Sequence, residues 1–572
     1  VTPGQAHIDG VAEPRLDGTT RVQRFNLGGF GVNPLQNLPD DPFGAMQQAS
    51  EALTQPAEAP VFSGSRGPED THLRLMVLEQ ADGTRLAFVM LDAVGAGNLI
   101  QKGVKEAINA AACELGACFA PAGTPGELIG NIVFGQTHTH AGADLQGLWG
   151  GVPQDWVVNT LYPQAAAAAR EAVAGLRPAR LTFQQGHTVE FNNYRRPRYD
   201  LDADADGTLT LVTAAGDDGT PVGSILQYNA HPTSINEDPR IPHADYIQGA
   251  MDWIEDPQTG SGGVALYYNG PIADASGSGS RAGCVREPSD ADYGNVRCRG
   301  EGMASAAQQF APHELAPTLQ AQHVEVTLPI TNAGFVALGM IGSFNRYYDF
   351  LMLPAGDIPG IGPLVQAEMV NLPQLTPVAK TLVSRITLGG AEQGLEIVTI
   401  PGEATNTFGQ YIRGLTGNKN MMLLGLTQNS FGYIIPEEEF NYVDPSGEAG
   451  LVAPFTGYEE NVSLGPLTAP LLRFQGYHPL FGIGPDDARN LPPVLLACAD
   501  DPMAEQCVLN NIGARIEYIQ NAYADQCRGF GGPEEFCQLF DPRTPLYDMC
   551  KDAGFPEETC RALGEPGDGS GG

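Results

Sequence analysis

Two histidines separated by one residue stand out in the stretch GQTHTHAGAD, at positions 138 and 140. The apolar run ELIGNIVFGQ before them is typical of a buried strand. Residues at i and i+2 of a strand lie on one face, so at a strand end His138 and His140 can point into the same cleft. Imidazole is a common metal ligand. By itself, the pair fits structural histidines as well as it fits a metal site.

Further candidate residues follow other apolar strands, one in each of four motifs. They are His231 in NAHPTS, Ser276 in YYNGPIADASGSGS, Glu403 in TIPGEATNTFG and Tyr433 in NSFGYIIPEEEF. The Gly-rich stretch leaves Ser276 exposed on a flexible turn, which is also typical of a plain linker. The repeated placement of such residues after apolar strands is more informative than any single motif, because α/β enzymes build their sites in loops at the carboxyl ends of buried strands. Two imidazoles and one carboxylate form a common catalytic zinc set.

The sequence also predicts the elements that must position these residues. LRLMVLEQ and RLAFVMLDAVG predict a hairpin around the turn Asp82-Gly83, and helices are expected at about 101–115 and over PQAAAAAREAVAGL. Further strands are expected over ARLTFQQGHTVEF, TLTLVTAA, PVGSILQYNAHP and GGVALYYNG, whose apolar runs indicate burial on both faces. The expected fold class is therefore α/β, with a mixed β-sheet core flanked by helices.

Two parts of the chain differ from this alternation. Residues 330–375 are apolar, aromatic and interrupted by Gly and Pro, which is typical of a core insertion and also of a lid over an apolar substrate. Near the end, cysteines recur among short helix-like segments. We expect a catalytic domain over 1–487 and a small, Cys-rich, disulfide-stapled helical module over 488–572.

The composition restricts the partners and the compartment. With 67 Asp and Glu against 31 Lys and Arg, the formal charge of −36 opposes binding to nucleic acid and to anionic membranes. No stretch is apolar enough to predict a transmembrane segment. The cysteines cluster locally, as Cys113 does with Cys118 and Cys284 with Cys298, which favours disulfides and a secreted, extracellular or periplasmic protein. Buried free thiols are the alternative, and a homo-oligomer is compatible with the sequence.

Five motifs, in order along residues 131–466, resemble those of the neutral (non-lysosomal) ceramidases. THTHAG is similar to their THTHSG, NAHPTS to A-x-H-P-x-S, and ADAS to part of G-D-V-S-P-N. PGEATNTFG is similar to P-G-E-x-T-T-x-x-G, and GYIIPEEEF with YEENVSLGP to Y-x-x-x-x-E-E-Y and Y-E-A-x-S-x-x-G-P. The resemblance implies a Zn²⁺ site made of His138, His231, Glu403 and Tyr433.

The same resemblance implies catalytic roles. Ser276 takes the position of the family's nucleophile, with a zinc-bound hydroxide as the alternative attacking group. His140 is implied as an acid/base or oxyanion residue, and Tyr458 as a second active-site tyrosine. Arg195 in NNYRRPRY matches the active-site arginine, with Arg196 as the alternative. The chain departs from the family in the Gly-Ser-Gly-Ser after Ser276, in an insertion around DPSGEAGLVAP, and in its Cys-rich end, where the family has an immunoglobulin-like domain.

We therefore expect a secreted, zinc-dependent hydrolase of N-acyl amide bonds. The expected substrate is a lipid-like N-acyl compound, ceramide, which would be cleaved to a fatty acid and a sphingoid base. A related zinc hydrolase of another amide or ester is one alternative. A non-enzymatic structural or assembly protein that retains the fold is another, and the presence of all four implied ligands argues against it.

Overall fold

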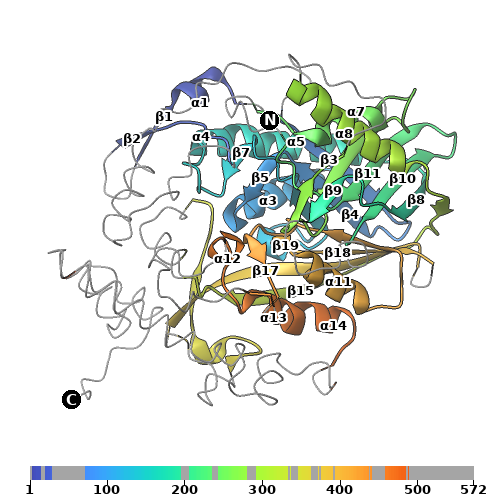
Figure 1. The fold of residues 1–572 in the computed structure, drawn as a ribbon. Helices are drawn as coiled ribbons and strands as arrows, with labels where there is room; N and C mark the ends of the chain where they lie inside the picture. Colours follow the sequence, from blue (N-terminus) through green and yellow to red (C-terminus); the bar gives the residue numbers. More distant parts are fainter. Residues whose placement is uncertain are drawn as a thin grey trace.

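The structure is a computed structural model, drawn as a ribbon in Figure 1. It describes residues 3–14, 20–28, 71–194, 205–234, 242–279, 291–332, 335, 346–362, 372, 375–390, 393–436, 439–440, 458–484, 487 and 528. The expected Cys-rich module lies outside the described residues except for residue 528, and Arg195 and Arg196 lie outside them too. The catalytic domain expected over 1–487 therefore contains nearly all of the described structure.

Three sheets of three or more strands form the frame of the described structure. The N-terminal sheet has the order β3 (Leu73–Glu79), β4 (Arg85–Leu91), β6 (Ile132–Gln136). The central sheet has the order β12 (Val264–Asn269), β11 (Pro221–Tyr228), β10 (Thr208–Gly216), β8 (Ala179–His187), β14 (Pro312–Glu314). The C-terminal sheet has the order β15 (Leu319–Pro329), β17 (Leu375–Leu388), β18 (Leu395–Thr399), β20 (Met421–Leu424), with β16 (Leu351–Pro354) beside β17. All three sheets are mixed, since each holds a parallel pair: β4–β6, β11–β12 or β18–β20.

Strands β4 and β12 are apolar along most of their length because alternate residues face two different cores. In β4, Phe88 packs in a core shared by all three sheets, whereas Val89 packs in the core beneath the neighbouring helices. In β12, Tyr268 packs in the same shared core, whereas Tyr267 packs against the helices of the central sheet. Successive side chains of a strand point to opposite faces, so the burial on both faces that the sequence predicts for GGVALYYNG is confirmed by β12. Strand β8 differs, since only Phe183 in it is buried.

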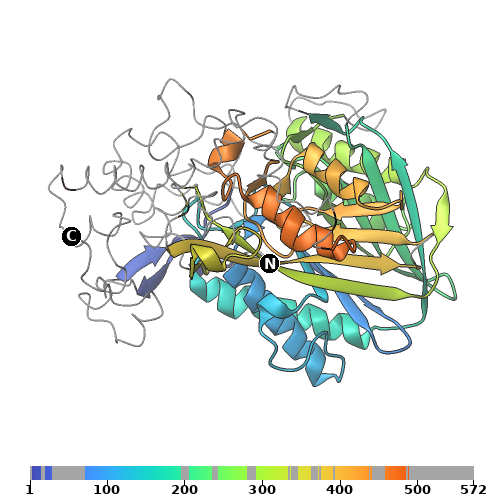
Figure 2. The same cartoon turned by 90° about the horizontal axis from the view of Figure 1, so that it is seen from below.

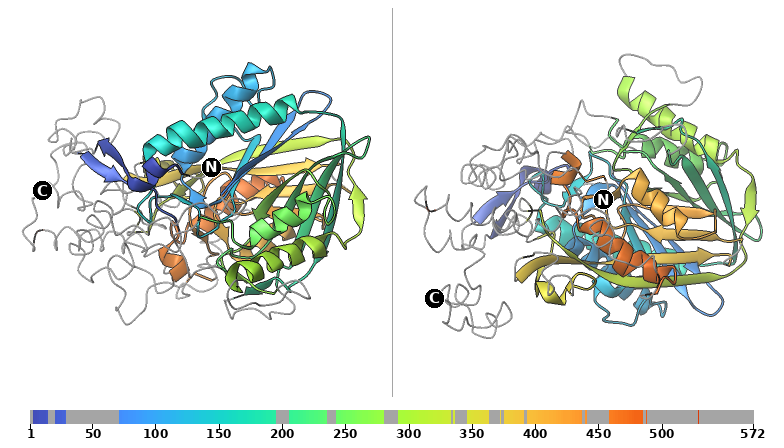
Figure 3. Two further views of the ribbon diagram at one scale, coloured as in Figure 1. Left: turned by 90° about the horizontal axis from the view of Figure 1, so that it is seen from above. Right: turned by 60° about the horizontal axis from the view of Figure 1, so that its bottom comes forward.

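Helices cover the outer face of each sheet (Figures 2 and 3). The N-terminal sheet is covered by α3 (Asn98–Glu114) and α5 (Tyr162–Ala174). The central sheet is covered by α7 (Tyr246–Glu255) and α8 (Ala291–Ala307). The C-terminal sheet is covered by α11 (Asn406–Gly414), α13 (Thr468–Leu471), η4 (Leu472–Tyr477) and α14 (His478–Leu480). This arrangement confirms the expected α/β class with helices flanking mixed sheets.

The remaining elements are short. They are α1 (Gln5–Asp9), β1 (Val11–Pro14), β2 (Thr20–Gln23), β5 (Ala93–Ala96), η1 (Gly126–Leu128), β7 (Ala143–Leu145), α4 (Gln154–Trp156), η2 (Val157–Leu161), β9 (Asn192–Tyr194), β13 (Ala275–Gly277), η3 (Ala355–Asp357), β19 (Glu403–Ala404), β21 (Tyr433–Ile434) and α12 (Tyr458–Asn461). The predicted hairpin is confirmed, with Gly83 at a positive φ of 87° in the β3–β4 turn. The strand expected over ARLTFQQGHTVEF ends at His187, and the chain forms β9 only afterwards.

The expected local pairing of Cys113 with Cys118 is confirmed. Cys113, at the end of α3, forms a disulfide with Cys118. Cys298 is also disulfide-bonded, whereas Cys284 lies outside the described residues. Among the helices that the structure describes, none is both long and apolar enough to cross a membrane.

Candidate metal centre and substrate pocket

The candidate ligands lie beyond the carboxyl ends of strands that belong to the three parallel pairs. His138 follows β6 and His231 follows β11, in the N-terminal and central sheets. Glu403 follows β18 and Tyr433 follows β20, in the C-terminal sheet. These last two residues are direct partners in the short parallel pair β19–β21. Parallel pairing therefore brings residues that are far apart in the sequence to the same end of the sheets.

His138 is held in an unusual backbone conformation. Strand β6 ends at Gln136, and His138 has a positive φ of 63°, so the i, i+2 argument for one strand face is wrong for this pair. Non-glycine residues are uncommon in this region, and such strain concentrates at functional sites. The His138 amide N–H donates to the Ala93 carbonyl at 2.9 Å, and the ring Nδ1 donates to the Val94 carbonyl at 2.5 Å. The Nε2 atom is therefore the one presented to the site.

His231 is oriented in the same way. Its amide N–H and its ring Nδ1 both lie near the Ala275 carbonyl, at 2.8 and 3.2 Å. Its Nε2 atom lies 3.0 Å from Glu403 Oε2. A ligating histidine usually donates its second ring nitrogen to a carbonyl or carboxylate, which fixes the tautomer and the ring orientation. His138 and His231 both show that pattern.

Several donor atoms lie close enough together to share one metal ion. Glu403 Oε2 lies 3.2 Å from His138 Nε2, and His140 Nε2 lies 3.3 Å from His138 Nε2. Ligands at zinc bond lengths on a tetrahedron are about 3.3 Å from one another. One ligand atom each from His138, His140 and His231 lies within 4.8 Å of the others. The residues present therefore fit a metal ion, and the geometry includes His140 in the cluster as well as the implied ligands His138 and His231.

Glu403 is suited to ligate a cation because it stays ionised. The residue is only 6% exposed, and burial alone would raise the pKa of its carboxyl. The His138 and His231 rings beside this carboxylate outweigh burial and hold the pKa of Glu403 well below its usual range. A buried carboxylate between two imidazole nitrogens is the donor set that a divalent metal needs.

The two candidate tyrosines meet at the same pocket. Tyr433 is buried, with 5% of its surface exposed, whereas Tyr458 on α12 is 61% exposed. Their ring centroids are 5.9 Å apart, and both residues line the pocket that contains His138, His140 and Glu403.

Ser276 lies beside the cluster but not in the described pocket wall. It belongs to β13, which pairs with β9, so the flexible turn expected for this residue is wrong. A β-bridge joins Ser276 to His231. The described pocket lining does not include Ser276, and Arg195 lies outside the described residues.

Most of the pocket wall is apolar or aromatic. Besides the candidate metal ligands and the two tyrosines, the wall is formed by Val94, Gln146, Leu148, Trp149, Phe335, Tyr348, Phe350, Phe431, Gly432, Val462 and Leu464. Three of these residues come from the apolar region 330–375, which thus supplies part of the pocket. Such a wall suits an aliphatic chain next to a polar reaction centre.

Sequence inspection missed Asp144, which shapes one side of this pocket. Its buried carboxylate accepts the amide N–H groups of Gln146, Gly147, Trp149 and Gly151 at 2.7–3.1 Å. Residues 146–149 thereby take a fixed path along the pocket. An aspartate followed by several glycines is the only local signal for such a turn, and it is not specific.

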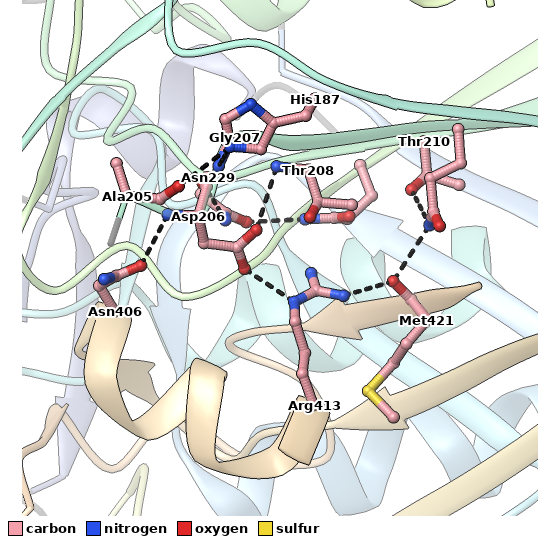
Figure 4. A network of polar contacts seen from close by, with 12 residues as sticks. His187, Ala205, Asp206, Gly207, Thr208, Thr210, Asn229, Asn406, Arg413 and Met421 are labelled. Carbon is pink, nitrogen blue, oxygen red and sulfur yellow. Dashed lines mark hydrogen bonds and ion pairs between the residues drawn. The ribbon is translucent and has the colours of Figure 1, made fainter. Parts of the chain in front are cut away.

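A buried polar network fixes the segment after Glu403 (Figure 4). Helix α11 begins three residues beyond Glu403, and its Arg413 Nε donates to Asp206 Oδ2 at 3.0 Å. The Asn406 side chain accepts the Asp206 amide N–H at 2.9 Å, and the Asn406 amide N–H donates to Asp274 at 2.9 Å. The network therefore ties α11 to the segments around the central sheet.

Comparison with known proteins gave similarity in structure alone. No protein-family model and no curated protein sequence matches the chain. The structure is similar to that of a neutral ceramidase from Pseudomonas aeruginosa, with a TM-score of 0.48 and 19% identity over 72% of this chain and 67% of that chain. It is also similar to a ceramidase complexed with C2, with a TM-score of 0.47 and 18% identity over 70% of this chain and 68% of that chain. Both are ceramidases, the class that the five sequence motifs resemble.

Proposed function

We propose that the protein is a zinc-dependent hydrolase of N-acyl amide bonds and that ceramide is its substrate. The observation that carries this proposal is the convergence of His138, His231 and Glu403. Glu403 Oε2 lies 3.2 Å from His138 Nε2 and 3.0 Å from His231 Nε2. Both Nδ1 atoms are already committed to backbone carbonyls. A cluster built only for stability would not need two oriented imidazoles facing an ionised, buried carboxylate.

Each residue of the site has a proposed task. His138, His231, Glu403 and Tyr433 would hold the zinc ion, which when bound would polarise a substrate carbonyl. His140 Nε2, beside the cluster, would accept and return a proton during cleavage. Tyr458, at the exposed side of the pocket, would contact the leaving amine. Ser276 is proposed, by motif resemblance, as the nucleophile or as a group that orients the substrate, and Arg195 as an oxyanion partner.

The apolar wall supports a lipid-like substrate. Trp149, Phe335 and Phe350 lie in the same pocket as the metal cluster, so an acyl chain can be removed from water while its carbonyl meets the polar end. We further propose that the protein is secreted. The disulfide between Cys113 and Cys118 supports this, because such bonds persist mainly in oxidising compartments.

Zinc analysis combined with ceramide turnover tests the proposal. We expect one zinc ion per chain, loss of fatty-acid release on chelation, and recovery when zinc is restored. His231→Ala should lose both metal and turnover, whereas His313→Ala, an exposed histidine on β14, should keep both. Full ceramide hydrolysis by metal-free protein would refute zinc dependence. A loaded enzyme that cleaves other N-acyl amides or esters but not ceramide would refute the substrate.

A further inference from the structure

The pocket contains one more polar side chain, that of Gln146. Only 7% of this residue is exposed, and it lines the pocket together with His138 and Glu403. Its Nε2 atom donates to the Tyr348 hydroxyl at 3.1 Å and to the Ser430 carbonyl at 3.2 Å. A buried amide with both of its N–H groups engaged is a built feature rather than a loose surface side chain.

The orientation of this amide follows from its partners. The Ser430 carbonyl can only accept, so the atom facing it must be the NH₂ group of Gln146. The Tyr348 hydroxyl donates its single proton to the same carbonyl at 2.8 Å, so toward Gln146 it must accept. Burial raises the pKa of Tyr348, which keeps that proton in place. A flipped Gln146 amide would set its oxygen against the Ser430 oxygen, and it is therefore excluded.

The backbone and the packing hold the amide in place. The Gln146 amide N–H donates to the buried Asp144 carboxylate at 3.1 Å, which fixes where the side chain starts. Its carboxamide packs against Gly95, where an added Cβ would come within 2.7 Å of Gln146 Cδ. Among the described residues, the hydrogen bonds of the Gln146 side chain are made by its Nε2 atom, and none is made to Oε1. This acceptor is thus fixed, on a side chain that lines the pocket.

We propose that Gln146 Oε1 accepts a hydrogen bond from the amide N–H of the substrate and makes Gln146 a specificity-determining residue for amides over esters. This inference rests on the proposed function and adds to it the bond type that the site selects. An ester presents an oxygen where an amide presents N–H, so two acceptors would face each other without a proton. Sites that hydrogen-bond a substrate group discriminate strongly against analogues that lack it, because the buried partner is left unpaired.

The test compares two substrates with the same acyl chain, an N-acyl amide and an ester. In the ester, an alcohol of the same shape replaces the amine of the amide. Gln146→Met keeps the size of the side chain and removes the acceptor. We expect the amide-to-ester ratio of kcat/KM to fall about 10- to 100-fold, mainly through the amide. Tyr348→Phe is the matched control, since it loosens the same network but leaves Oε1. It should lower turnover of both substrates together and leave their ratio within about twofold. Zinc content should be unchanged in both variants.

The outcomes separate the two proposals. If zinc-loaded wild-type protein hydrolyses neither substrate, the proposed function fails and this inference fails with it. If the wild-type protein is active and Gln146→Met leaves the ratio unchanged, only this inference is refuted. An equal fall of the ratio in Tyr348→Phe would also refute it, because a general loosening of the pocket would then explain the effect.

Discussion

The ion pair between Asp206 and Arg413 offers a test of how the fold supports the metal centre. Asp206 is 2% exposed, and its Oδ2 accepts from Arg413 Nε at 3.0 Å while its Oδ1 accepts from the Thr208 amide at 3.0 Å. Arg413 lies on α11, the helix that begins just beyond Glu403. Asp206→Asn keeps the shape of the side chain but leaves the Arg413 charge uncompensated in a largely buried position.

The magnitude follows from the burial of the pair. Removing one partner of a buried ion pair costs about 3–5 kcal/mol, because the remaining charge is desolvated and unpaired. Since one edge of the Asn side chain can still accept from Thr208, we expect about 3 kcal/mol, at the lower end of that range. The assay is equilibrium urea unfolding, together with competition for zinc against a chelator. Zinc affinity should also fall, because α11 begins three residues beyond Glu403 and loses its tie to Asp206.

The pH dependence has a defined sign. Burial alone would raise the pKa of Asp206, but Arg413 and Thr208 lower it below the usual value of 3.8. The stabilisation is therefore fully present above about pH 4 and is lost as the pH falls through the lower, folded-state pKa. In Asp206→Asn this part of the acid dependence should disappear. Arg413→Met and the double variant complete a double-mutant cycle, in which the coupling free energy between Asp206 and Arg413 should be about 2 kcal/mol or more. If the two substitutions instead change the free energy of unfolding additively, to within about 0.5 kcal/mol, the reasoning is refuted.

Three further predictions concern the core and the site. Burial lowers the pKa of Lys105 to about 7. The free energy of unfolding should therefore rise between about pH 7 and pH 10, because over that range only the unfolded chain keeps the Lys105 proton. Lys105→Met should abolish this rise in unfolding curves, whereas Lys102→Met, at a partly exposed position of the same helix, should not. Gly95→Ala should displace the Gln146 amide and lower the amide-to-ester ratio at unchanged zinc content, as steady-state kinetics would show. His231→Ala should lower zinc affinity at least 100-fold in a chelator competition, because it removes a ligand; retained stoichiometric zinc would contradict the site.

The sequence predicted the frame of the fold well. The apolar run RLAFVMLDAVG forms β4 and the start of β5, and GGVALYYNG forms β12. The Ala-rich stretch forms α5, as predicted. These predictions succeed because strand and helix periodicity is a local property that burial imposes on the sequence. The short strand β9 was not separated from β8, since its pairing partner β13 lies about 80 residues away in the chain and leaves no local signal.

The site was predicted only in part. Its motifs located His138, His231, Glu403 and Tyr433 at strand ends, and the structure brings His138 and His231 within hydrogen-bond distance of the same Glu403 carboxylate oxygen. The sequence attributed the THTH pair to one strand face, whereas a left-handed residue at His138 turns the ring into the cluster. That conformation depends on hydrogen bonds to residues 93 and 94, which no inspection of THTH alone can reveal.

The sequence by itself determined which residue types could ligate a metal and where strands would deliver them. Only the tertiary structure decided that three parallel strand pairs end at one place, that Glu403 and Tyr433 are neighbours, and that Gln146 enters the pocket from a loop held by Asp144. The physical reason is range. Propensity and periodicity act over a few residues, whereas the Glu403 oxygen lies about 3 Å from histidine nitrogens that are more than 170 residues away in the chain. Their positions follow from sheet pairing and buried hydrogen bonds.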